Sequence, residues 1–182
     1  NPSIRAIYED SRGVFWLGSW GGGLYRFDPI KQTLAQFTEV EGLANNFVKG
    51  MLADSHENLW ITTENGMSKF DPTTGKFKGF TTRDGLQSNF FWSGSFCKGR
   101  DGRMFFGGTN GFNAFHPDSI RDNPNVPPIV ITRFMVLNEP MTLGSGNEVS
   151  LQYHQDFFSF EFVALNYTAP EKNEYAYRME GF

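Results

Sequence analysis

The stretch Asp54-Ser55-His56-Glu57-Asn58-Leu59-Trp60 repeats an earlier stretch, Asp10-Ser11-Arg12-Gly13-Val14-Phe15-Trp16, at a distance of 44 residues. A looser copy, Gly99-Arg100-Asp101-Gly102-Arg103-Met104-Phe105, follows 45 residues after the second. A period of roughly 20 to 50 residues is typical of repeat architectures, in which each repeat is one supersecondary unit. The chain is therefore predicted to begin with a series of like modules.

Further landmarks recur in the same order within each copy. They are Gly23-Leu24, Gly66-Met67 and Gly111-Phe112, followed by Phe27-Asp28-Pro29, Phe70-Asp71-Pro72 and Phe115-His116-Pro117. The second copy holds four strand-sized runs, Lys49 to Ala53, Leu59 to Thr63, Met67 to Asp71 and Lys76 to Thr81. Four strands in about 44 residues are typical of a β-propeller blade.

The repeated residues have structural roles in this interpretation. An aspartate at the start of a hairpin turn can accept hydrogen bonds from its own downstream backbone, which accounts for Asp10 and Asp54. The large rings at Trp16, Trp60 and Phe105 fall on one face of the second strand. We expect these rings to fill the space between neighbouring blades.

The third repeat lacks its last strand, because a proline-rich segment stands where that strand is expected. Beyond it, Ile129 to Leu137 reads as a strand. Phe158 to Ala164 and Tyr175 to Met179 show the alternation of half-buried strands. Only 54 residues remain from Ile129 to the end, which is too few for an immunoglobulin-like sandwich of ~100 residues.

The sequence therefore predicts an all-β chain with three parts. Residues 1–122 form about two and three-quarter four-stranded blades of a partial β-propeller, and residues 123–128 form a Pro-rich linker. Residues 129–182 form the first part of an incomplete immunoglobulin-like β-sandwich. We expect the chain to be a segment of a larger protein.

The composition excludes several classes of protein. Aromatic residues make up 16% of the chain, with 20 Phe and 20 Gly, which favours short strands joined by glycine turns. The net charge of -4, with scattered Lys and Arg, provides no basic surface for nucleic acid. No apolar run approaches the ~20 residues that cross a bilayer. Cys97 is the single cysteine, and we expect it to be a buried strand residue.

The sequence contains no pattern of residues that is typical of a catalytic or metal-binding site. The histidines, which have no metal-type spacing, are His56, His116 and His154. Asp10, Asp54 and Asp101 are candidate glycosidase carboxylates, but the repeated turn position already explains the first two. We therefore expect no catalytic residue, no metal and no cofactor.

Positions that differ between repeats are better binding candidates than shared ones, because structural needs account for the latter. Trp20 lies in a glycine-rich loop and has Glu64 as its rough equivalent. At the entry to the first strand, which faces the central channel of a propeller, Arg5, Lys49 and Trp92 occupy corresponding positions. A sugar requires a flat apolar face with charged or amide hydrogen-bonding groups. The predicted ligand-binding residues are Arg5, Trp20, Asn46, Lys49, Asn89 and Trp92.

The order of these motifs resembles a known family. The runs from Asp10 to Gly18 and from Asn58 to Asp71 resemble the two-component-regulator propeller repeat, and Phe105 to Pro117 looks like the last blade of that propeller. The segments from Phe158 to Tyr167 and from Tyr175 to Phe182 are similar to the three-tyrosine domain that follows it. Together these segments cover nearly the whole chain.

This resemblance implies the periplasmic sensor region of an inner-membrane hybrid two-component system, which senses oligosaccharides and controls polysaccharide utilisation genes. It implies an oligosaccharide ligand of the complete propeller. The membrane helix, histidine kinase, receiver and DNA-binding module would lie outside this segment, so the segment itself is expected not to be an enzyme. Two alternatives stay open: a propeller scaffold for protein contacts without a small ligand, and a propeller-type glycan hydrolase or lyase.

Open strand edges also predict how the chain associates. Unpaired edge strands readily pair with another chain, so we expect a homodimer or a strand-exchanged oligomer. Light scattering tests this expectation, and a strictly monomeric, well-dispersed sample contradicts it.

Overall fold

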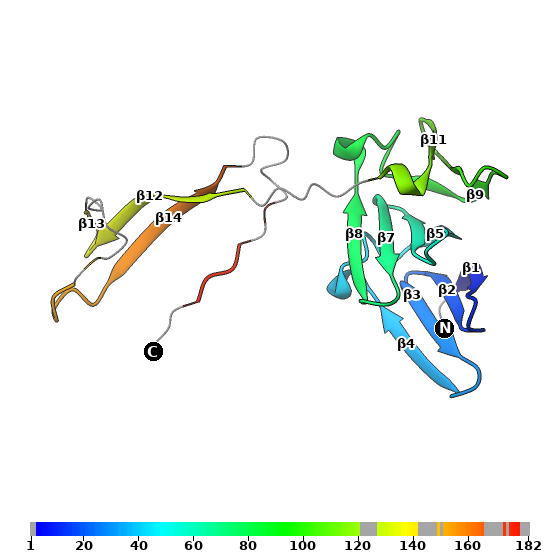
Figure 1. Ribbon diagram of the computed structural model, residues 1–182, viewed down its shortest axis with the longest axis horizontal. Helices are drawn as coiled ribbons and strands as arrows, with labels where there is room; N and C mark the ends of the chain where they lie inside the picture. Colours follow the sequence, from blue (N-terminus) through cyan, green and yellow to red (C-terminus); the bar gives the residue numbers. More distant parts are fainter. Residues whose placement is uncertain are drawn as a thin grey trace. The chain divides into compact units, whose positions relative to one another are not determined.

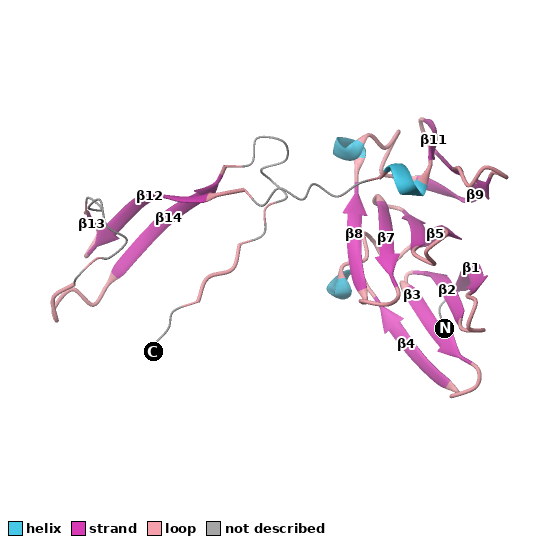
Figure 2. Cartoon of the chain, viewed as in Figure 1, coloured by secondary structure: helices cyan, strands magenta, loops and turns pink. Residues whose placement is uncertain are grey.

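The computed structural model describes residues 3–120, 127–141, 149, 151–165, 173 and 175–178. The chain divides into two compact units, Asn1–Arg121 and Asp122–Phe182. Strands dominate both units (Figure 2), and the helical structure of the described residues consists of short 3-10 turns. The all-β class predicted from the sequence is confirmed.

The first unit contains two four-stranded antiparallel sheets and one three-stranded sheet, and within each sheet every strand pairs with the next one along the chain. The first sheet comprises β1 (Ser3–Glu9), β2 (Phe15–Trp20), β3 (Leu24–Asp28) and β4 (Thr33–Phe37). The second comprises β5 (Val48–Ala53), β6 (Leu59–Thr63), β7 (Met67–Asp71) and β8 (Lys76–Phe80). The third comprises β9 (Phe91–Lys98), β10 (Met104–Gly108) and β11 (Gly111–Phe115).

The three sheets are arranged as neighbouring propeller blades. Strands β1, β5 and β9 contact one another. Figure 1 shows them on the opposite side of the unit from β4 and β8. In a β-propeller the first strand of each blade lies near the central axis and the fourth strand lies outside. The predicted partial propeller is confirmed, and each strand predicted in the second repeat matches the structure to within one residue at either end.

The repeated hairpin turn is held by its aspartate. Asp10 Oδ1 accepts a hydrogen bond from the Val14 backbone N–H (3.0 Å), and Asp10 Oδ2 accepts one from the indole N–H of Trp16 (3.2 Å). Burial tends to raise the pKa of Asp10, but these hydrogen bonds, the Val14 one foremost, hold it below its ordinary value. Asp54 and Trp60 repeat the carboxylate–indole bond at 3.2 Å. The turn and the tryptophan are therefore one structural device.

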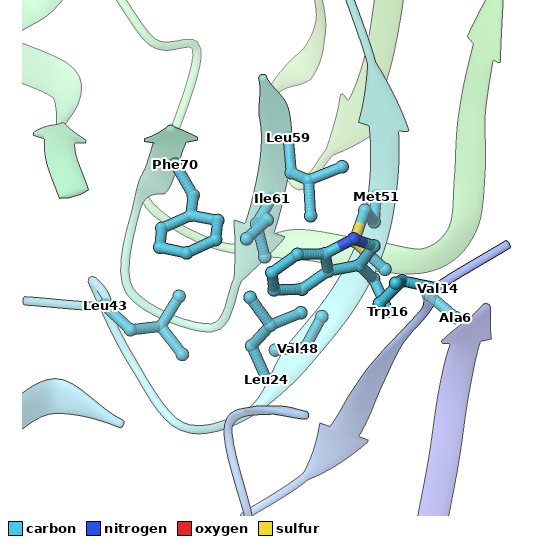
Figure 3. Packing of buried hydrophobic residues seen from close by; sticks show 10 residues of the cluster. All are labelled: Ala6, Val14, Trp16, Leu24, Leu43, Val48, Met51, Leu59, Ile61 and Phe70. Atoms are coloured by element: carbon cyan, nitrogen blue, oxygen red, sulfur yellow. The ribbon is translucent and has the colours of Figure 1, made fainter. Parts of the chain in front are cut away.

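The large rings fill the junctions between blades, as predicted. Trp16 is 1% exposed and its ring lies 5.3 Å from that of Phe70 in the second blade. Trp60 is equally buried and lies 4.8 Å from Phe115 in the third. Figure 3 shows the Trp16 indole amid apolar side chains of both the first and the second blade. Apolar side chains from both neighbouring blades thus fill each of these two junctions.

Among the described residues the third blade has three strands, and residues 121–126, where most of a fourth strand would fall, lie outside the described part of the chain. A 3-10 turn, Pro117–Ser119, follows β11 directly. Gly99 and Phe105 stand where the other blades have the paired aspartate and tryptophan, so both partners of that hydrogen bond are replaced together. Phe105 is only partly buried and lies 6.4 Å from Phe112 of its own sheet. Its predicted packing between blades is not seen among the described residues.

The prediction of a buried Cys97 is wrong, because the structure exposes this side chain. Phe96, its neighbour in β9, faces the second blade, where it approaches Gly50. Successive side chains of a strand point to opposite faces. Cys97 therefore points to the face of β9 that no described blade covers.

The second unit contains a three-stranded antiparallel sheet in the order β13-β12-β14. Its strands are β12 (Ile129–Val136), β13 (Glu139–Pro140) and β14 (Phe158–Ala164), so the predictions for Ile129 to Leu137 and Phe158 to Ala164 agree with the structure to within one residue. The immunoglobulin-like sandwich itself stays a prediction. Residues 123–126 of the predicted linker, and the motif residues Asn166, Tyr167 and 179–182, lie outside the described residues.

The strand predicted from Tyr175 onward is wrong over residues 175–178, which have no strand structure. The alternation itself has a physical basis, since the ring of Tyr175 lies 5.0 Å from Phe162 and that of Tyr177 lies 6.3 Å from Phe160. The Tyr175 hydroxyl accepts a hydrogen bond from the Ala164 backbone N–H (3.1 Å). Side chains rather than a backbone ladder join this segment to β14.

Candidate functional site

The inner strands carry irregularities at the positions singled out in the sequence. In the β1–β2 pairing the register shifts between Ile4 and Ala6, which leaves Arg5 as the extra residue. In the β5–β6 pairing the shift falls between Val48 and Gly50 and leaves Lys49. A β-bulge bends its strand and redirects a side chain. Both basic residues therefore leave the ladder at the same place in successive blades.

These redirected side chains meet at one aromatic ring. Lys49 Nζ lies 3.8 Å from the centroid of the Trp20 ring, and Arg5 Cζ lies 5.2 Å from it. The Trp20 ring also meets Phe47 edge-on at 5.4 Å. Cations at these distances are attracted to the face of an indole. Three of the six predicted binding residues thus form one group, called here the Trp20 cluster: Arg5, Trp20 and Lys49.

Lys49 is the buried centre of this cluster. It is 3% exposed, and its Nζ donates a 2.7 Å hydrogen bond to Glu64 Oε1. The Phe90 ring lies 5.1 Å from the same Nζ. A buried ammonium is tolerated only when it is paired and hydrogen-bonded. Glu64 and the two rings meet this requirement, and together they join the first blade to the segment that enters the third.

Trp92 is connected to the Trp20 cluster through Phe90. It is 54% exposed, and its ring lies 5.2 Å from that of Phe90, which in turn faces Lys49. Trp20 is 40% exposed, so two indoles remain accessible beside the buried charge. Phe47 and Phe90 were not predicted as site residues. Their recurrence in Asn46-Phe47 and Asn89-Phe90 is the signal that identifies them.

Asn46 and Asn89 have structural roles that the sequence did not reveal. Asn46 Oδ1 accepts a hydrogen bond from the Glu39 backbone N–H (3.0 Å), and Asn89 Oδ1 accepts one from that of Thr82 (2.8 Å). The backbone carbonyl of Asn46 also accepts a bond from Gly23 N–H (2.9 Å). These contacts shape the loop between blades in both repeats, so the recurrence of asparagine does not require a ligand.

Two histidines come closer than their sequence spacing suggests. The Nδ1 atoms of His56 and His116 each lie 3.7 Å from the Asp118 carboxylate. In the part of the chain that the structure describes, no group of His, Cys, Asp and Glu residues is arranged to hold a metal ion. The described residues likewise include no helix that is long and apolar enough to cross a membrane.

The fold and the Trp20 cluster define a propeller-repeat protein with a candidate binding face at its inner rim. Residues 1–21 and 42–65 match the family model described as two component regulator propeller. Each matched segment begins close to the first strand of a blade and covers its first two strands. These two segments are therefore similar to two-component-regulator propeller repeats.

Two known proteins are similar in sequence to parts of this chain. The chain is 28% identical over 151 residues to Histidine kinase P4 of Formosa agariphila, a match to 77% of this chain and 11% of that protein. It is 36% identical over 77 residues to a protein named DNA ligase from Chlorobium luteolum, a match to 42% of this chain and 11% of that protein. The chain therefore spans about a tenth of the length of these relatives.

A solved structure resembles nearly the whole chain. It is described as the extracellular domain of a hybrid two component system from B. thetaiotaomicron, with 23% sequence identity and a TM-score of 0.52. The match covers 92% of this chain and 30% of that one. The similarity concerns the fold.

Proposed function

We propose that this chain is the ligand-sensing and signal-transmitting part of a hybrid two-component sensor histidine kinase, that it works in the periplasm, and that it is not itself an enzyme. The propeller repeats and the relation to a histidine kinase support the sensor assignment. The observation that carries the proposal is the Trp20 cluster, in which a buried charge lies against a partly exposed indole at the inner rim of the blades. Association into a homodimer or a strand-exchanged oligomer stays a prediction.

The proposed ligand is an oligosaccharide whose recognition contributes to control of polysaccharide utilisation. Sugar rings present flat C–H faces and hydroxyl groups, which suit an exposed indole beside hydrogen-bond donors. Trp20 offers its accessible ring, and Arg5 is exposed next to it. Lys49 and Glu64 are already bonded to each other, so they act by fixing the indole rather than by contacting sugar hydroxyls.

We expect Trp20→Ala to weaken oligosaccharide binding by about tenfold or more, equivalent to ~1.4 kcal/mol. The substitution removes the ring on which a sugar would stack and against which the cationic neighbours lie. The measurement is calorimetry of the complete extracellular region against a panel of plant and host oligosaccharides. The ligand that produces heat with the unaltered protein is then titrated into the variant.

Ile30→Ala is the matched control, because Ile30 is 86% exposed and lies in the turn between β3 and β4. This variant should bind as the unaltered protein does. If no oligosaccharide in the panel produces heat, the result favours the alternative of a propeller scaffold for protein contacts over a sugar sensor. If products are released from the panel, the hydrolase or lyase alternative replaces it.

A further inference from the structure

Two Asn-Gly pairs lie in corresponding turns of successive blades. Asn65-Gly66 lies in the turn between β6 and β7, and Asn110-Gly111 lies in the turn between β10 and β11. The side-chain carbonyl carbon of an asparagine can be attacked by the backbone nitrogen of the next residue. This attack is easiest before glycine, which has no Cβ to keep the two groups apart. Both pairs are therefore chemically able to lose ammonia.

The attacking nitrogen of the first pair is held in place. Gly66 is buried, and its N–H donates a 2.6 Å hydrogen bond to the backbone carbonyl of Asn89, in the loop that leads to the third blade. A Cβ on Gly66 would lie 2.6 Å from the backbone oxygen of Phe80, so the glycine is closely surrounded. To attack the side chain of Asn65, this nitrogen would have to leave its acceptor and move where there is little room. The fold therefore protects Asn65.

The second pair lacks this protection in the part of the chain that the structure describes. Gly111 is exposed, and a Cβ on it would meet no described atom within 4 Å. No blade follows the third among the described residues, so no loop accepts from Gly111 as Asn89 accepts from Gly66. Exposed turns open locally at little cost. The nitrogen of Gly111 can therefore reach the side chain of Asn110.

Two contacts of Asn110 oppose this reaction only weakly. Its Nδ2 donates to the backbone carbonyl of Gln87 (3.3 Å), and its backbone N–H donates to Gln87 Oε1 (2.7 Å). Both hydrogen bonds are exposed, so water replaces them at less cost than it would replace the bond of the buried Gly66. Neither of them restrains the nitrogen of Gly111.

We propose that Asn110 is a site of spontaneous deamidation and that the fold protects Asn65 from the same reaction. The nitrogen of Gly111 gives its proton to water and forms a bond to Asn110 Cγ. The Cγ–Nδ2 bond then breaks, and Nδ2 takes up a proton and leaves as ammonia. Water opens the resulting succinimide ring at either carbonyl, which gives aspartate or isoaspartate. The reaction consumes water, releases ammonia and involves no oxidation or reduction.

The reaction places a negative charge beside the loop that carries Phe90. An ionised carboxylate only accepts hydrogen bonds, so the bond from Asn110 to the Gln87 carbonyl is lost and two oxygens face each other. The neighbouring Thr109 N–H donates to the backbone carbonyl of Phe90 (3.3 Å). The modified turn therefore holds this loop less firmly. These contacts carry the proposal, which does not depend on the function proposed above.

Peptide mapping by mass spectrometry tests the proposal on the full chain, kept at body temperature and slightly alkaline pH for several weeks. Deamidation is detected as the mass increase that accompanies the change from amide to acid. We expect Asn110 to convert about tenfold faster than Asn65, because the barrier at Asn65 includes the loss of a buried hydrogen bond. In urea, where the fold is absent, the two residues should convert at similar rates.

Gly111→Ala should slow the conversion of Asn110 in urea as well as in water, because the added methyl group hinders the attacking nitrogen. The urea measurement stays decisive if this variant does not fold. Asn110→Asp reproduces one product and should speed amide hydrogen exchange at Thr109, whereas Asn65→Asp, which adds the same charge in the corresponding turn, should not. The proposal is overturned if Asn65 converts as fast as Asn110 in the folded chain, or if Asn110 converts only in urea. Equal exchange at Thr109 in the two aspartate variants would overturn the effect on the Phe90 loop.

Discussion

Trp60→Ala is expected to destabilise the chain by about 3–5 kcal/mol, the usual loss for truncating a buried tryptophan. Trp60 is 1% exposed, and its ring lies 5.5 Å from Phe80 in its own blade and 4.8 Å from Phe115 in the next. The substitution also removes the indole N–H that donates a hydrogen bond to Asp54. Urea unfolding followed by circular dichroism should therefore show a large fall in the midpoint.

Trp92→Ala is the control, since it makes the same chemical change at a side chain that is 54% exposed. Surface substitutions of this kind usually change the free energy of unfolding by less than about 0.5 kcal/mol. Equal shifts for the two variants would contradict the view that the repeated indole joins one blade to the next.

The architecture of the first unit was predictable because its determinants are local and repeated. Asp54 bonds backbone groups only a few residues away and the indole of Trp60, so the whole device lies within one short stretch of sequence. A pattern of this kind recurs wherever the module recurs. The four strands of each complete blade then follow from the spacing of turns.

The candidate site was predictable only in part, because its members come from different repeats. Trp20, Lys49 and Phe90 are far apart in the chain. The β-bulges that turn Arg5 and Lys49 toward the Trp20 ring cannot be predicted from the sequence pattern. The roles of Asn46 and Asn89 were missed for a related reason. Their carbonyl oxygens bond to backbone N–H groups, which carry no sequence signal.

Repeats also differ through side chains that are absent, which a sequence pattern does not emphasise. Glu57 accepts a hydrogen bond from the Ser11 backbone N–H in the first blade, whereas its counterpart in the third repeat, Gly102, has no side chain. In the second unit the period-two pattern at Tyr175 and Tyr177 reported side-chain contacts with β14, not strand pairing. Periodicity shows which side chains share a face but not whether the backbones pair.

Gly18→Ala is expected to destabilise the chain by about 1–3 kcal/mol, the usual cost of overpacking a close junction. A Cβ placed on Gly18 in β2 would lie 2.5 Å from Cγ1 of Val48 in the second blade and 3.4 Å from Cβ of Ala6. Val48 is fully buried and branched at Cβ, so it has little room to move. The first two blades would have to separate, which the midpoint of urea unfolding measures.

Gly79→Ala is the matched control, because it adds the same methyl group in β8 with nothing within 4 Å. Since alanine restricts the unfolded chain more than glycine does, this variant should be neutral or slightly more stable. Val48→Ala in the Gly18→Ala background should recover part of the loss, and this double-mutant cycle would isolate the contact between the two blades. No recovery, or an equal loss in Gly79→Ala, would mean that the glycine is needed for the backbone of β2 and not for the approach of its neighbour.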